Sequence, residues 1–293
     1  MGNQASSVVP PPSSHYQSRI LPESFFTRYT QHSSDAYSST SIVFRSSDEQ
    51  YFSLRKKDID AHAGALIPST WNSRSLAAEL PEASTTLRTL FAFIRARNHP
   101  TLLNESFESV AEIAKAAEKY KVFSAINICA ERMRSFGDRH PKLVLLYAAH
   151  NDHHHIFDEC APRVITSEKL ESIVPLLPEY LRLPWLRYHA RWSNALTNII
   201  SYSYSSDLSD VWKNTNCWES CGRLVFQVLE AGVHSLNDPS WIFADRVSGH
   251  TGSCSQCKQL CFAWKTYTQT QIDGVGAFTE TCLDCESAAE GQS

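Results

Sequence analysis

The sequence lacks the segments that insert proteins into membranes. No apolar run approaches the roughly 18 residues that a membrane-spanning helix needs. Residues 1–14 are polar and rich in proline, without the charged and apolar regions of a secretory signal peptide. We therefore expect a cytoplasmic or nuclear protein, in a compartment where cysteine thiols stay reduced.

The motifs of the common enzyme classes are missing as well. Glycine is scarce, with 10 in 293 residues, and neither G-x-G-x-x-G, G-x-x-x-x-G-K-[ST] nor G-x-S-x-G occurs. A formal net charge of −4 also argues against a dedicated nucleic-acid surface, which needs clustered Lys and Arg. These absences predict a protein without catalytic residues or a cofactor, and without direct nucleic-acid binding.

What the chain does contain is typical of a globular protein preceded by a polar arm. Hydrophobic residues make up 42% and charged residues 20% of the sequence, ordinary values for such a protein. Residues 1–40 are rich in Ser, Pro, Gln and Tyr, and we expect them to form a disordered arm. The one apolar island in this arm is Ile20 to Phe26.

The region from 41 to 136 shows a change of hydrophobic period. Two short apolar runs within 41–54 enclose a polar turn, which predicts a β-hairpin, and residues 77–80 are a further strand candidate. Helical spacing follows near 84–95, 106–120 and 123–135. The predicted core comprises Val43, Phe44, Leu87, Leu90, Phe91, Ile94, Val110, Ile113, Ala117, Phe123 and Ile126.

This order of elements resembles the BTB (POZ) domain, especially its fungal subgroup. The similar segments include Ile42-Val43-Phe44-Arg45-Ser46-Ser47-Asp48, Leu80-Pro81-Glu82, Leu90-Phe91-Ala92-Phe93-Ile94 and the stretch from Ala114 to Ala125. The resemblance implies an α+β, mostly α fold: a small BTB/POZ-like sheet flanked by helices over 41–136, followed by an all-helical extension over 137–205. We expect residues 206–293 to form a helical C-terminal region, with helices near 217–234 and 257–272 and a frayed tail.

The resemblance also implies function. BTB-like proteins bind other proteins, self-associate as homo-oligomers, and serve as adaptors for cullin-type ubiquitin ligases or as scaffolds in transcriptional regulation. We expect the interface around residues 42–66 and the apolar island Ile20 to Phe26. Two departures bear on this: the family's F-x-D-V motif is Ser39-Thr40-Ser41-Ile42 here, and its H-K is replaced by Arg55-Lys56-Lys57. They put co-repressor-type groove binding in doubt and leave cullin binding open.

The cysteines of the last third suggest an alternative. Two C-x-x-C pairs, with Cys261 one helical turn after the first, have a spacing that a tetrahedral Zn²⁺ site could use; the pairs are Cys254 with Cys257 and Cys282 with Cys285. The chain would then be a zinc-stabilised regulatory protein whose C-terminal region makes the specific contact. The competing interpretation is that these are small core residues on helices, with an exposed pair on the tail.

Three further patterns have two interpretations each. The run His150, His153, His154 and His155 resembles a metal site, but it falls between two helices, where we expect solvated rings. The aromatics Trp185, Tyr188, Trp192 and Trp212 favour packing over a ligand cage. Finally, Met1-Gly2-Asn3-Gln4-Ala5-Ser6 matches the N-myristoylation pattern at Gly2. A single acyl chain would give at most weak, reversible membrane contact.

Overall fold

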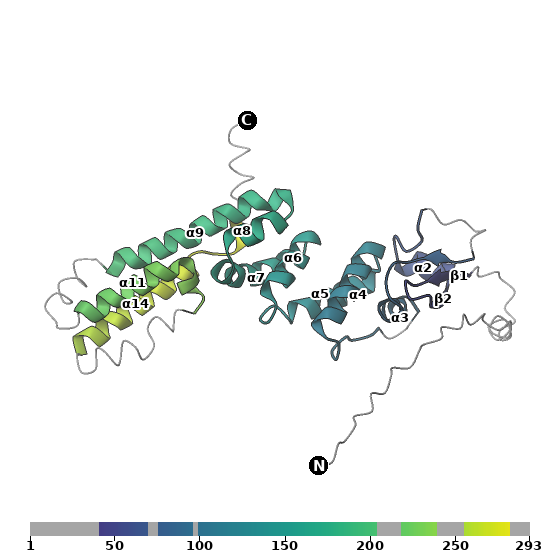
Figure 1. The fold of residues 1–293 in the computed structure, drawn as a ribbon, viewed down its shortest axis with the longest axis horizontal. Coiled ribbons are helices and arrows are strands. Elements are labelled where there is room, and N and C mark those ends of the chain that lie inside the picture. Colours follow the sequence, from purple (N-terminus) through teal and green to yellow (C-terminus); the bar gives the residue numbers. More distant parts are fainter. Residues whose placement is uncertain (1–40, 70–75, 96–98, 204–217, 239–254, 282–293) are drawn as a thin grey trace, which may run out of the picture. The chain divides into compact units, whose positions relative to one another are not determined.

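The computed structural model describes residues 41–69, 76–95, 99–203, 218–238 and 255–281. Over these residues the chain is mostly helical with one small mixed sheet, which confirms the predicted α+β, mostly α class. The sheet has the order β2-β1-β3, and Figure 1 labels its strands β1 and β2. Strands β1 (Ser41–Arg45) and β2 (Tyr51–Arg55) form the predicted hairpin, and β3 (Ala78–Glu79) pairs with β1 in parallel.

Alternation along the hairpin decides which side chains enter the core. In β1 the buried residues are Ile42 and Phe44, and the cross-strand partner of Ile42 is Leu54, which is also buried. Val43 was predicted in the core but is only half-buried. The reason is that successive side chains of a strand point to opposite faces, so Val43 cannot share the inner face with Phe44.

Helices α2 (Lys56–His62) and α3 (Ser84–Arg95) follow the strands. Helix α3 buries the predicted face, and within it Phe91 lies with its ring 5.4 Å from that of Phe44 and 5.3 Å from that of Phe52. The sheet and α3 therefore share one aromatic core, in which Phe91 is wholly buried.

The helices α4 (Phe107–Tyr120) and α5 (Phe123–Arg134) pack against each other. Helix α4 begins at its N-cap Ser106, whose side chain accepts from the Ser109 N–H at 3.3 Å. Two predicted core residues of α5 were wrong, because Phe123 is 56% exposed and Ile126 is only half-buried. Val122, the residue before the helix, is buried in place of Phe123. Val122 forms a β-bridge with Ala63, which turns it inward and leaves Phe123 outside.

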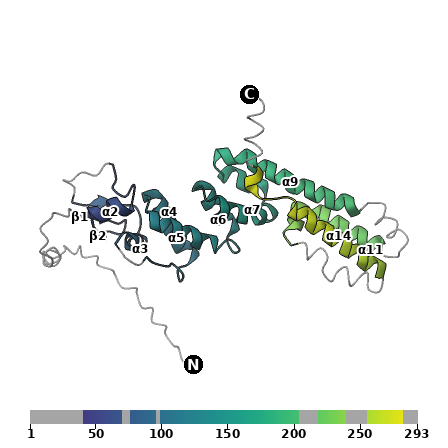
Figure 2. The ribbon, with the colours of Figure 1, turned by 180° about the vertical axis from the view of Figure 1, so that it is seen from behind.

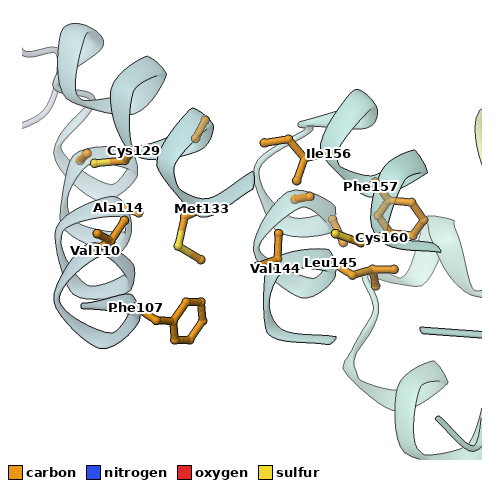
Figure 3. Close-up of a cluster of buried hydrophobic side chains, with 14 of the residues drawn as sticks. Phe107, Val110, Ala114, Cys129, Met133, Val144, Leu145, Ile156, Phe157 and Cys160 are labelled. Atoms are coloured by element: carbon orange, nitrogen blue, oxygen red, sulfur yellow. The ribbon is translucent and has the colours of Figure 1, made fainter. Parts of the chain in front are cut away.

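Helices α6 (Pro141–His150) and α7 (His154–Ser167) form the next antiparallel pair. Figure 3 shows side chains from α4 and α5, such as Met133, lying in one cluster with side chains from α6 and α7, such as Val144. Within the extension that was expected to be all-helical, the chain next forms a short α8 (Leu170–Ile173) and a 3₁₀ turn η1 (Val174–Leu176) in place of one continuous helix. Proline at 175 explains the interruption, because it lacks an N–H and clashes with a regular helix.

The long helix α9 (Glu179–Ser203) contacts both α11 (Trp218–Ala231) and α14 (Ser255–Asp273), and the 3₁₀ turn η2 (Gly232–Leu236) follows α11. Figures 1 and 2, which are views from opposite sides, both show α11 and α14 beside α9. The last two helices agree with the predicted ranges. The Trp264 indole N–H on α14 donates to the Ile199 carbonyl of α9 at 2.9 Å, and Trp264 is wholly buried.

The aromatic residues of α9 pack as core residues, as the sequence favoured. Trp185, Tyr188 and Trp192 are buried, and Trp212 lies outside the described residues. Phe278, from the short helical turn after α14, inserts among them with its ring 5.6 Å from that of Tyr188 and 4.5 Å from that of Phe157. The Asp158 carboxylate accepts from the Thr279 N–H at 2.9 Å and from its hydroxyl at 2.6 Å. The C-terminal turn is thereby tied to α7 and α9.

Candidate interaction surface

The hairpin and α2 present a polar surface. Helix α2 buries only Ile59 and exposes the rest of its length, apart from the half-buried Asp58. Lys56 contacts Asp60 at 2.7 Å, and Arg55 contacts Asp58 at the same distance. Tyr51, at the start of the edge strand β2, is 50% exposed. Residues 42–66 thus offer charged groups and one aromatic ring, so an apolar anchor for this surface would have to come from another segment.

A shallow hollow of about 350 Å³ lies beside the other end of the sheet. It is lined by Arg45, Ser46, Ser47, Glu79, Leu80 and Pro81. The Arg45 guanidinium crosses this region and contacts Glu49 at 2.6 Å and Glu79 at 3.0 Å. These two carboxylates, with the hydrogen bond to Glu79 as the largest cause, raise the pKa of Arg45. The lining is thus mixed polar and apolar, and its one cationic side chain is paired with two carboxylates.

The Asp48 carboxylate holds the hairpin turn on the N-terminus of α3. It accepts from the Ser84 N–H at 2.8 Å and from the Ser84 hydroxyl at 2.6 Å. These hydrogen bonds, together with one from Ser46, lower the pKa of Asp48 to about 2. A carboxylate that caps a helix end satisfies N–H groups that have no partner within the helix. Asp48 is therefore a positioning residue for the hairpin.

A partly buried polar cluster joins α4 to α6 and to the N-terminus of α7. His153 Nε2 lies 3.2 Å from the Glu118 carboxylate and 3.2 Å from the Tyr147 hydroxyl. The side chains of His153 and Glu118 are only 16% and 12% exposed. Sequence reasoning expected this histidine to be solvated, and that was wrong: Glu118, far away in the sequence, supplies its partner. His150, His154 and His155 are exposed as expected.

The same cluster contains a cysteine, a histidine and a glutamate, the residue types of cysteine-dependent catalysis, but its thiol is held in the protonated form. Cys129 is wholly buried, and burial together with the Glu118 charge raises the pKa of its thiol to about 12. Burial also raises the pKa of the Tyr147 hydroxyl. A thiol with so high a pKa carries almost no thiolate, the nucleophilic form, near neutral pH. The cluster is better explained as a hydrogen-bonded joint between helices.

The predicted metal ligands fall largely beyond what the structure describes. The described residues do not include Cys254, Cys282 and Cys285. They also do not include Gly2, the candidate for N-myristoylation. Cys257 lies in α14, but its side chain is outside the described part of the structure. Cys261, one turn later, is buried. Among the described residues, no group of three or more His, Cys, Asp or Glu side chains is placed to hold a metal ion. His150 and His154 belong to two different helices, so their spacing of four does not place them on one helix face.

Within the described ranges, no helix combines the length and the apolar character required to cross a bilayer. Comparison of the chain with protein-family models, with curated proteins and with solved structures finds no match.

Proposed function

We propose that the chain is a non-catalytic protein–protein interaction module of the BTB/POZ type, acting in the cytoplasm or the nucleus. In this proposal it self-associates through its N-terminal half. It serves as an adaptor for a cullin-type ubiquitin ligase or as a scaffold in transcriptional regulation.

The order of elements carries this proposal. A hairpin, a short helix, a third strand and three consecutive helices follow one another from β1 to α5. This order supports the proposal, because the resemblance implied a small sheet flanked by helices over 41–136. The segment Ser46-Ser47-Asp48, which contributed to that resemblance, has a positioning role through the contact of Asp48 with Ser84. The titratable side chains of the described site candidates take part in ion pairs, caps and helix contacts, which supports a binding role over catalysis.

The test is the solution mass of the chain with and without its arm. Deleting residues 1–36 should lower the number of chains per particle, obtained by light scattering at low concentration as the measured molar mass divided by the mass of the shortened chain, while the far-ultraviolet circular dichroism of the remainder is kept. A full-length variant with Ser at Ile20, Leu21, Phe25 and Phe26 should behave like the deletion. The matched control is Val8→Ser with Val9→Ser in the same arm, which should keep the wild-type mass. An unchanged number of chains per particle in the deletion would refute the role of the arm.

The cullin adaptor role is tested separately. Purified full-length chain and the purified N-terminal domain of a cullin should form a complex that survives gel filtration. Arg55→Glu combined with Lys56→Glu and Lys57→Glu should weaken it if the hairpin surface contributes. Absence of a complex with every cullin tested, alongside intact self-association, would leave the scaffold role and reject the adaptor role.

The zinc-stabilised alternative rests on the two C-x-x-C pairs. Elemental analysis of the purified chain should find about one zinc per chain if four thiolates close one tetrahedral site. Cys282→Ser with Cys285→Ser should abolish that zinc, whereas the control Cys160→Ser, at a buried thiol, should retain it. A metal-free wild-type chain would reject this alternative.

A further inference from the structure

The C-terminal turn, which comprises residues 278–281, lies against α7 and α9 in the way a bound peptide lies on its receptor. Phe278 is buried, and its ring lies 4.5 Å from that of Phe157 and 5.6 Å from that of Tyr188. The next residue, Thr279, donates its N–H at 2.9 Å and its hydroxyl at 2.6 Å to the Asp158 carboxylate of α7. An apolar pocket with a few well-placed polar groups is typical of a binding site.

Four residues of α7 and α9 receive the turn, and we call them the ring pocket: Phe157, Asp158, Trp185 and Tyr188. Its three rings contact one another directly, because the Trp185 ring lies 5.8 Å from that of Phe157 and 6.0 Å from that of Tyr188. Asp158 is only half-buried, which places the polar part of the pocket near the protein surface. These contacts do not depend on Phe278, and a preformed site loses less free energy on binding its ligand.

A connection that contains two glycines joins the turn to α14. It comprises residues 274–277, since α14 ends at Asp273. Gly276 has φ +74°, a left-handed conformation that suits glycine, and a Cβ at this position would clash with the Glu280 carboxylate. Glycine also adopts many other backbone conformations at little cost. The connection therefore allows the turn to leave the ring pocket while α14 stays folded.

We propose that the ring pocket is a binding site for a peptide segment in which phenylalanine is followed directly by threonine, and that the C-terminal turn occupies it as an intramolecular ligand. A partner protein with the same dipeptide competes with the turn for the pocket, so the turn regulates access to it. This inference uses only α7, α9 and the residues after α14, and it does not rest on the BTB-type proposal.

The short connection sets the affinity expected of a free peptide. A short flexible linker gives an effective concentration on the order of 1 mM. Burial of a phenylalanine ring favours the docked turn by about a hundredfold. The intrinsic Kd of the same segment as a free peptide is then about 10 µM. In the wild-type chain the turn already fills the pocket, so the apparent Kd is about a hundredfold weaker, on the order of 1 mM.

Binding of a free peptide to a chain without its own anchor tests the site. The probe is a fluorescent peptide with the sequence of residues 274–281, Gly-Val-Gly-Ala-Phe-Thr-Glu-Thr, and the receptor is full-length Phe278→Ala. Fluorescence anisotropy should show saturable binding, about a hundredfold tighter than to the wild type. The matched control Phe262→Ala, at an exposed ring on α14, should bind no better than the wild type. Equal affinity of Phe278→Ala and the wild type, or no binding to a Phe278→Ala chain with wild-type circular dichroism, would overturn the proposal.

Two changes locate the bound peptide. In the Phe278→Ala background, Asp158→Ala should weaken peptide binding by about tenfold or more, because it removes the acceptor of two charge-assisted hydrogen bonds. A peptide with alanine in place of its phenylalanine should not bind. Peptide binding that either change leaves unaltered would place the peptide outside the ring pocket and reject the assignment.

The wild-type chain offers a test that does not depend on the folding of a variant. Free peptide at about 2 mM should occupy about two-thirds of the ring pockets, given an apparent Kd on the order of 1 mM. The displaced C-terminal turn should then be cleaved in limited proteolysis, as identified by mass spectrometry. The alanine peptide at the same concentration should leave the turn resistant. Equal cleavage, or equal resistance, with the two peptides would reject competition for one site.

Discussion

The aromatic core beneath the sheet should be the most sensitive point of the N-terminal half. Phe91 is wholly buried on α3, with its ring near both Phe44 and Phe52. Truncation of a buried phenylalanine to alanine costs about 3–5 kcal/mol. Two ring contacts, each contributing about 0.5–1.5 kcal/mol beyond burial, place Phe91→Ala in the upper half of that range. This loss is comparable to the whole stability of many domains, about 5–15 kcal/mol.

Urea unfolding followed by circular dichroism would measure this cost. Because Phe91→Ala is expected to fold poorly, Phe91→Leu provides a second measurement: it keeps most of the apolar burial and loses the ring contacts, for a cost of about 1–3 kcal/mol. The matched control is Phe262→Ala on α14, where the ring is 72% exposed and the change should stay within about 0.5 kcal/mol. Equal midpoints for Phe91→Ala and the wild type would show that Phe91 does not lie in the core.

Further predictions concern the cap, the thiols and the C-terminal turn. Since the pKa of Asp48 is lowered to about 2 from an ordinary value of about 3.9, its contribution to stability should be full above pH 4. It should decline as the pH falls toward 2, and Asp48→Asn should flatten that part of the stability profile. Burial raises the thiol pKa values of Cys129 and Cys160 to about 12 and about 11. Alkylation with iodoacetamide at pH 8 should therefore leave both thiols unmodified in the native chain and modify both in urea, as measured by mass spectrometry. Native labelling of either thiol would contradict its burial. Phe278→Ala should cost about 3–5 kcal/mol and release the C-terminal turn to limited proteolysis, and unchanged resistance would argue against the anchor.

Local signals in the sequence were sufficient to place most of the secondary structure, although they did not predict α2 (Lys56–His62). Hydrophobic period and turn residues predicted the hairpin, the strand near 77–80 and the helices from α3 to α5, and the C-terminal helices also appear near their predicted ranges. These features depend on neighbours within a few residues, and a single chain therefore contains the information. The same signals misplaced Val43 and Phe123, because burial also depends on which face of an element meets the rest of the chain.

Tertiary structure alone decided the contacts between distant residues. The cap of Asp48 on Ser84, the pairing of His153 with Glu118 and the insertion of Phe278 beside Phe157 each join segments that are far apart in sequence. No local period encodes such partners, since each depends on how whole elements pack. The two faces of α9 depend on both the sequence and the tertiary structure. The order of residues along the helix was present in the sequence, but only the packing of Trp185 and Tyr188 into the core determined that Leu183 faces outward. Exposure is a property of the assembled fold, and the local sequence does not determine it.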